Sequence, residues 1–213
     1  MRLAFFSSLL LLTASATQAA TPIDGWYSGL FVGYAYIPNN INTIHQAIRY
    51  QNASYEPGYN GGGNFGYKSR PMRYEAEVTY FNANLKHFAQ NQIRQTHVGG
   101  YNNGVMGMAN IYYDAPGIIS CLEPFIGGGI GYAWLNIPLR NLSTTTPSSY
   151  RITSSAFAYQ GTVGVTYNFA ENYALNIGYR YLATPHVFKL GHMFQTNLAN
   201  VGIIYRYEND RYK

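Results

Sequence analysis

Hydrophobic and polar residues alternate with a period of two along most of the chain, in segments of about ten residues. In 72–81, Tyr74 and Val78 fall on one side of the pattern and Glu75 on the other. This is the period of a β-strand, whose successive side chains point to opposite faces. Eight segments show it: 26–36, 59–67, 72–81, 105–113, 126–134, 157–168, 175–181 and 200–207.

The connections between these segments alternate in length. Three are short or turn-like: 68–71, 114–123 and 170–172. Four are long and polar: 37–57, 82–102, 135–153 and 182–195. Short turns at one end and long loops at the other are typical of outer-membrane barrels, whose turns are periplasmic and whose loops are extracellular. We therefore predict an all-β fold, an eight-stranded antiparallel up-and-down transmembrane β-barrel with four long extracellular loops.

The chemistry of the two strand faces decides between a membrane barrel and a soluble one. A soluble eight-stranded barrel that holds a ligand has apolar side chains inside and polar ones outside. Here one face is apolar and capped by aromatic residues, so we expect it to contact lipid. The opposite face, which we expect to point inward, carries polar and charged residues: Arg73, Glu75, Glu77, Asn110, Gln160 and Arg180.

Composition agrees with this reading. Tyr and Gly number 22 each, and charged residues make up only 11% of the chain, against about 25% in an average soluble domain. Tyr and Trp favour the boundary between hydrocarbon and headgroups. The formal net charge is +5. Cys121 is the single cysteine, so an intramolecular disulfide and a thiolate metal cluster are excluded.

The first residues have the layout of a secretory signal peptide. Met1 and Arg2 give a basic start, 3–12 is mostly apolar, and small residues lead to Ala19. The apolar stretch is too short for a transmembrane anchor. The predicted division is a signal peptide at 1–19 and a barrel domain at 20–213.

Several segments in order resemble the opacity-type outer-membrane β-barrel family, relatives of outer-membrane protein A. They are GWYSGLFVGY at 25–34, MANIYYD at 108–114, PFIGGGIGYA at 124–133, GYRYL at 178–182 and ANVGI at 199–203. The resemblance implies a bacterial outer-membrane location. It does not imply one function, because the family includes adhesins, surface antigens and small channels. Family members commonly end on a Phe that the insertion machinery recognises; here Tyr207, or else Tyr212, would serve.

Catalytic and ligand-binding signatures are sparse. A lipid A deacylase needs a Ser beside a His base and a carboxylate, yet no His stands two residues before a Ser. Pairing of His87 with Ser54 or Glu56 across the loops stays open. All five histidines fall in the expected long loops, which leaves metal or proton sensing as a weaker hypothesis: His45, His87, His97, His186 and His192. The glycines at 61–63 and 127–131 precede no predicted helix, which disfavours a phosphate cradle. We predict no catalytic residue, cofactor, metal or nucleic-acid partner.

The inward charges favour a filled lumen. An eight-stranded barrel has room only for side chains, and buried charges require partners. The third and seventh strands face each other across the barrel, so Glu75 or Glu77 is expected to meet Arg180. A structural plug is preferred over a gate in a conducting path.

The expected function is surface interaction or envelope integrity through the loops of a non-enzymatic, monomeric barrel. The alternatives are a narrow channel and, third, a lipid A-modifying enzyme. Glu56 is the one acidic residue of the loops, against six cations: Arg49, Lys86, Arg94, Arg140, Arg151 and Lys189. This imbalance predicts anionic partners, either lipopolysaccharide phosphates or host-surface glycans.

Overall fold

The computed structural model describes residues 24–38, 42–45, 48–90, 93–95, 98–99, 101–116, 121–141, 148–185 and 193–207. The predicted signal peptide lies outside these residues. The described residues form one sheet of twelve strands. The strands are β1 Gly25–Tyr36, β2 Asn42–His45, β3 Ile48–Tyr55, β4 Gly58–Ser69, β5 Met72–Gln90, β6 Ile93–Gln95, β7 Val98–Gly99, β8 Tyr101–Asp114, β9 Leu122–Asn141, β10 Ser148–Asn168, β11 Tyr173–Thr184 and β12 Phe194–Arg206. No helix in the described part of the chain is long and apolar enough to span a bilayer.

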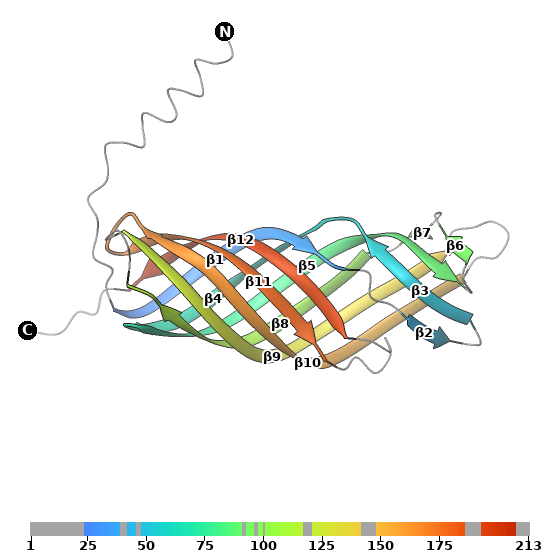
Figure 1. Cartoon of the computed structure of the whole chain (residues 1–213), viewed down its shortest axis with the longest axis horizontal. Coiled ribbons are helices and arrows are strands. Elements are labelled where there is room, and N and C mark those ends of the chain that lie inside the picture. The colour runs from blue at the N-terminus through green and yellow to red at the C-terminus, as the bar shows by residue number, and fades with distance from the viewer. Residues whose placement is uncertain are drawn as a thin grey trace, which may run out of the picture.

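Eight of these strands close into a barrel (Figure 1). Each pairs antiparallel with the next long strand along the chain, in the order β1, β4, β5, β8, β9, β10, β11 and β12. The last strand returns to the first, with Val32 opposite Val201 in the β1–β12 pair. The predicted up-and-down barrel of eight strands is confirmed.

The two ends of the barrel differ as the connection lengths predicted. At one end, here the turn end, three short connections join β4 to β5, β8 to β9 and β10 to β11. Cys121 lies in the second of them, immediately before β9. The described chain begins and ends there too: the Tyr207 backbone nitrogen donates to the Trp26 carbonyl at 2.9 Å. The role of Tyr207 as an insertion signal remains a prediction.

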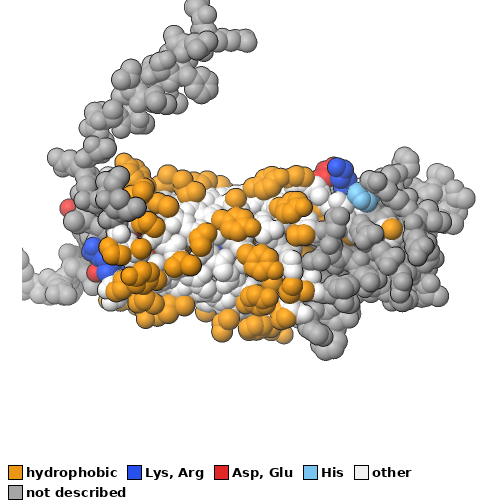
Figure 2. Space-filling model, viewed as in Figure 1, with side chains coloured by type: hydrophobic (Ala, Val, Ile, Leu, Met, Phe, Trp, Pro, Cys, Tyr) orange, Lys and Arg blue, Asp and Glu red, His pale blue; other side chains and the backbone are white. Residues whose placement is uncertain are grey.

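The outward face is apolar over the middle of the barrel. Figure 2 shows hydrophobic side chains spread along the wall, with charged groups near its two ends. Leu30 and Ile177 are 69% and 57% exposed. Exposed aromatic side chains lie toward both ends of the wall, among them Trp26 near the start of β1 at the turn end and Trp134 of β9 toward the other end. Such aromatic girdles flank the hydrocarbon zone of membrane barrels.

The opposite end, here the loop end, differs from the sequence-based expectation. The predicted loop 82–102 is largely strand, because β5 continues to Gln90 and β8 begins at Tyr101. The predicted loop 135–153 is likewise mostly β9 and β10, and 37–57 contains β2 and β3. These three segments were therefore wrongly expected to be loops.

The reason is that the apolar side chains of β5 change from the outward to the inward face where the strand leaves the membrane. Up to Tyr80, apolar side chains of β5 point outward; beyond it, Phe81 and Leu85 are buried inside while Lys86 is exposed outside. A strand that leaves the hydrocarbon has water outside, so its apolar residues face inward as in a soluble barrel. The alternation thus continues with the opposite orientation, and the polar residues of this region concealed it.

Candidate functional site

The lumen near the turn end is filled by a buried ion-pair network. The Lys68 ammonium lies 2.6 Å from a Glu123 carboxylate oxygen and 3.1 Å from one of Asp114. The Arg73 guanidinium lies 3.2 Å from the other Asp114 oxygen. Each of these side chains is at most 11% exposed. The two cations come from the adjacent strands β4 and β5 and the two carboxylates from β8 and β9, so the ion pairs join all four strands.

A second layer lies deeper in the lumen and confirms the predicted cross-lumen pair. Arg180 of β11 donates to the Glu77 carboxylate of β5. Thr79 donates to the same Glu77 oxygen at 2.6 Å, and Asn110 to the other at 3.3 Å. The Arg180 guanidinium also lies over the Phe31 ring, 4.4 Å from its centroid. Of the two carboxylates considered from sequence, Glu77 is the partner of Arg180.

Glu75 has a different set of partners. Its two carboxylate oxygens accept from the Tyr27 hydroxyl at 2.7 Å and the Tyr112 hydroxyl at 3.5 Å. A guanidinium nitrogen of Arg73 lies 3.9 Å away. Glu75 thus lies between Arg73 of the turn-end network and Glu77 of the deeper layer on the inward face of β5.

Charge inside the described lumen is balanced. The buried cations are Lys68, Arg73, Arg180 and Arg206, and the buried carboxylates are Glu75, Glu77, Asp114 and Glu123. Two spaces among these groups have volumes of about 30 and 10 Å³, each with room for roughly one or two water molecules at most. Side chains therefore fill the lumen at this depth, and more charged groups take part than Glu75, Glu77, Arg73 and Arg180 alone.

The loop-end half of the lumen is apolar, which corrects the expectation of a polar inner face along the whole barrel. Phe81 stacks on Phe194 with ring centroids 5.8 Å apart. Around them lies one continuous buried cluster, which includes Ile37, Leu85, Met106, Leu135, Leu182 and Leu198. Burial raises the pKa of the Tyr55 hydroxyl in this cluster, so Tyr55 is neutral there. Where the wall is surrounded by water, the interior becomes the hydrophobic core.

Known proteins share this fold. A family model described as outer membrane protein beta-barrel domain matches residues 5–207. The chain belongs to this family. An outer membrane protein of Gluconacetobacter diazotrophicus is 28% identical over 94% of this chain and 57% of its own length. The chain thus spans little more than half of that relative. The protein is an outer-membrane β-barrel, as predicted.

Two solved structures are similar to this outer-membrane barrel. Neisserial surface protein A is 15% identical with a TM-score of 0.56, covering 86% of this chain and 97% of that one. OprG from Pseudomonas aeruginosa is 13% identical with a TM-score of 0.60, covering 89% and 99%. At these identities the likeness establishes the fold alone. The turn end is periplasmic and the loop end extracellular in proteins of this architecture.

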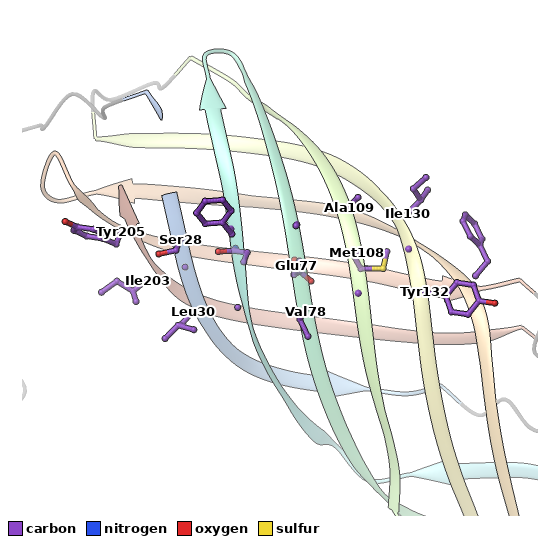
Figure 3. Close-up of a pocket in the computed structure, with 18 of the residues that line it drawn as sticks. Ser28, Leu30, Glu77, Val78, Met108, Ala109, Ile130, Tyr132, Ile203 and Tyr205 are labelled. Atoms are coloured by element: carbon purple, nitrogen blue, oxygen red, sulfur yellow. The ribbon is translucent and has the colours of Figure 1, made fainter. Parts of the chain in front are cut away.

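The lipid-facing wall of the barrel has a broad apolar hollow of about 1230 Å³. Figure 3 shows its lining, in which Leu30, Val78 and Ile130 belong to β1, β5 and β9. Gly63 is opposite Val78, and Val78 is opposite Gly107. Small residues beside large ones therefore leave a depression, which membrane lipid would cover.

The residues considered for catalysis are only partly brought together. The β3–β5 register places Ser54 opposite His87, while Glu56 lies exposed beyond the end of β3. His45 and His87 lie in β2 and β5, not in loops as expected; the other three histidines lie outside the described residues. Within the described part of the chain, no group of three His, Cys, Asp or Glu side chains could hold a metal ion.

Proposed function

We propose that this protein is a non-conducting, non-enzymatic outer-membrane barrel that acts through its extracellular end in surface interaction or envelope integrity. The observation that carries this proposal is that two successive layers of side chains fill the lumen. The first is the ion-paired layer around Glu77 and Asp114; the second is the apolar cluster around Phe81.

The two layers oppose ion passage by different physical means. In the charged layer each buried cation and carboxylate lies beside an oppositely charged or hydrogen-bonding side chain, so a permeating ion would have to displace these contacts. In the apolar layer an ion would lose its hydration without compensation, and such constrictions exclude water. A narrow channel, the second function considered from sequence, is disfavoured for this reason.

The extracellular end is suited to presenting a binding surface. Strands β9 and β10 contain 20 and 21 residues, whereas about 9–11 residues span a bilayer. Their paired extensions, from Trp134 opposite Ser155 to Asn141 opposite Ser148, carry the wall beyond the hydrocarbon. A paired, core-filled wall holds its surface in a defined geometry, which lowers the entropic cost of binding.

The partner proposed for this end is anionic. Lys86 and Arg151 are exposed on the outward face. The side chains of Arg49, Arg94 and Arg140, and the whole of Lys189, lie outside the described residues. Acidic glycans are the partner class that such a surface attracts, most strongly at low salt.

Two measurements test the proposal. The refolded protein in a planar bilayer should show no conductance steps; discrete openings would favour the channel. Cells that display the protein should bind a sulfated polysaccharide, and raising the salt concentration or replacing Lys86 and Arg151 with Gln should weaken the binding. Arg70→Gln is the control, because Arg70 is an exposed cation at the turn end. Adhesion that changes neither with salt concentration nor with these substitutions would refute the role of the cations.

A further inference from the structure

A row of amide and hydroxyl side chains crosses four strands at the extracellular membrane boundary. The pairings of β5 with β8, β8 with β9 and β9 with β10 place these residues opposite one another: Asn82, Asn103, Asn136 and Thr153. The row one step toward the membrane centre contains Tyr80, Val105, Trp134 and Ser155. The polar row therefore begins where the aromatic girdle ends, which is the depth of lipid headgroups.

A hollow of about 420 Å³ lies over these two rows. Its lining combines the rings of Tyr80 and Trp134 with the side chains of Asn103, Asn136 and Thr153. Trp134 is 53% exposed, so one large aromatic surface is open at this depth.

The lining has the chemistry that recognises a sugar. The apolar C–H face of a sugar ring packs on an aromatic ring, while its hydroxyls exchange hydrogen bonds with amides and hydroxyls. The Asn136 side-chain oxygen is buried and has no hydrogen-bond partner. A sugar hydroxyl can supply the missing donor. The Asn82 amide already donates to the Tyr80 hydroxyl at 3.2 Å, which orients that ring.

The extracellular halves of β5, β8, β9 and β10 carry charge of one sign. Neither 78–113 nor 124–170 contains an Asp or Glu, and these stretches supply the extracellular halves of β5, β8, β9 and β10. Lys86 and Arg151 are exposed there, farther from the hydrocarbon than the asparagine row. Glu56 is on the other edge of β5, where its backbone nitrogen donates to the Asn84 carbonyl. Cations just above a sugar-binding row suit phosphate groups.

We propose that this wall binds the phosphorylated saccharide headgroup of an outer-leaflet glycolipid. The glycolipid lies against the outside of the barrel, with its acyl chains beside the apolar wall. Its sugar ring stacks on Trp134, its hydroxyls bond to the asparagine row, and its phosphate pairs with Arg151 or Lys86. This site is lateral to the barrel. It shares Lys86 and Arg151 with the surface proposed to bind glycans, whereas Trp134 and the asparagine row belong to this site alone.

The sequence offers a direct reporter for this site. Its two tryptophans are Trp26 and Trp134, and they lie toward opposite ends of the barrel. A Trp26→Phe protein in detergent micelles therefore carries a single fluorophore, inside the proposed site. Titration with purified lipopolysaccharide should shift the Trp134 emission and saturate.

Removal of the polar row should weaken this binding. Asn103→Leu combined with Asn136→Leu should raise the dissociation constant about tenfold, because each lost hydrogen bond contributes a modest net free energy. The matched control is Asn197→Leu on β12, which is diametrically opposite β8 in the barrel. Asn197 is opposite the outward-facing Tyr36 and should leave the affinity unchanged. Equal weakening by both variants, or by neither, would overturn the proposal.

Two further ligands distinguish recognition of the sugar from attraction to the negative charge. Dephosphorylated lipopolysaccharide should bind more weakly, and Arg151→Gln with Lys86→Gln should then have no additional effect. Phosphatidylglycerol should not compete, since it is anionic but lacks the sugar. Competition at the same concentration as lipopolysaccharide would mean that the wall attracts anionic lipid without recognising a saccharide, which would also overturn the proposal.

Discussion

Arg180 and Glu77 are separated by 103 positions in the sequence and form an ion pair through the middle of the barrel. They belong to the seventh and third strands of the eight-stranded ring, which are diametrically opposite. The contact is possible because a barrel of this size leaves only a side-chain's width across its lumen. It ties two distant walls of the barrel together.

Loss of one partner of this pair should be costly. Arg180→Met should destabilise the barrel by about 3–5 kcal/mol, because it leaves the Glu77 carboxylate buried without its cation. Glu77→Gln in the same protein should recover part of the loss. The measurement is reversible urea unfolding from lipid vesicles. Simple additivity of the two single changes would show that the pair is not coupled.

The position of the membrane boundary on the outward face can be tested by introducing Arg at two heights along the barrel. Ile177→Arg places a cation in the hydrocarbon zone and should cost about 2–4 kcal/mol, whereas Asn84→Arg, on an outward position above the girdle, should cost about 0–1 kcal/mol. The same unfolding assay compares them. Equal costs would mean that the membrane boundary is not at the Tyr80 row.

Two glycines are expected to differ in how much stability they lose on substitution by Ala. A Cβ on Gly66 would lie 2.5 Å from the Tyr74 carbonyl oxygen and 2.5 Å from the Tyr27 hydroxyl, so Gly66→Ala should cost about 1–3 kcal/mol through overpacking. A Cβ on Gly161 would meet nothing within 4 Å, and Gly161→Ala should change stability by less than about 0.5 kcal/mol. Unfolding of the two variants side by side decides this, and a neutral Gly66→Ala would contradict the tight contact.

If both the ion-paired layer and the apolar layer block ions, disrupting one of them should not open a conducting path. Phe81→Ala with Leu135→Ala thins the apolar layer, and the barrel should still conduct no current because the Glu77 layer stays intact. Planar-bilayer recording measures this directly. Channel openings in that variant would show that the ion-paired layer does not seal the lumen.

The barrel could be predicted from the local pattern of residues. Alternation around residues such as Val78 and Ile177 gave the eight strands and the lipid-facing side, because a strand in hydrocarbon must be apolar on one face. The same alternation placed Glu77 and Arg180 inside, and the strand count put them on opposite walls. The choice between Glu75 and Glu77 could not be made, since both share one face and differ only in height.

The arrangement of the strands outside the membrane could not be predicted and became visible in the folded protein. The period of two continues through Phe81 and Leu85, but with apolar side chains inward, because water replaces lipid around the wall there. Without the position of the membrane boundary, Asn82 and Lys86 indicate a polar loop. Asn103 and Asn136 also become neighbours only through the register of β8 and β9, since 33 positions separate them along the chain and no local pattern links them.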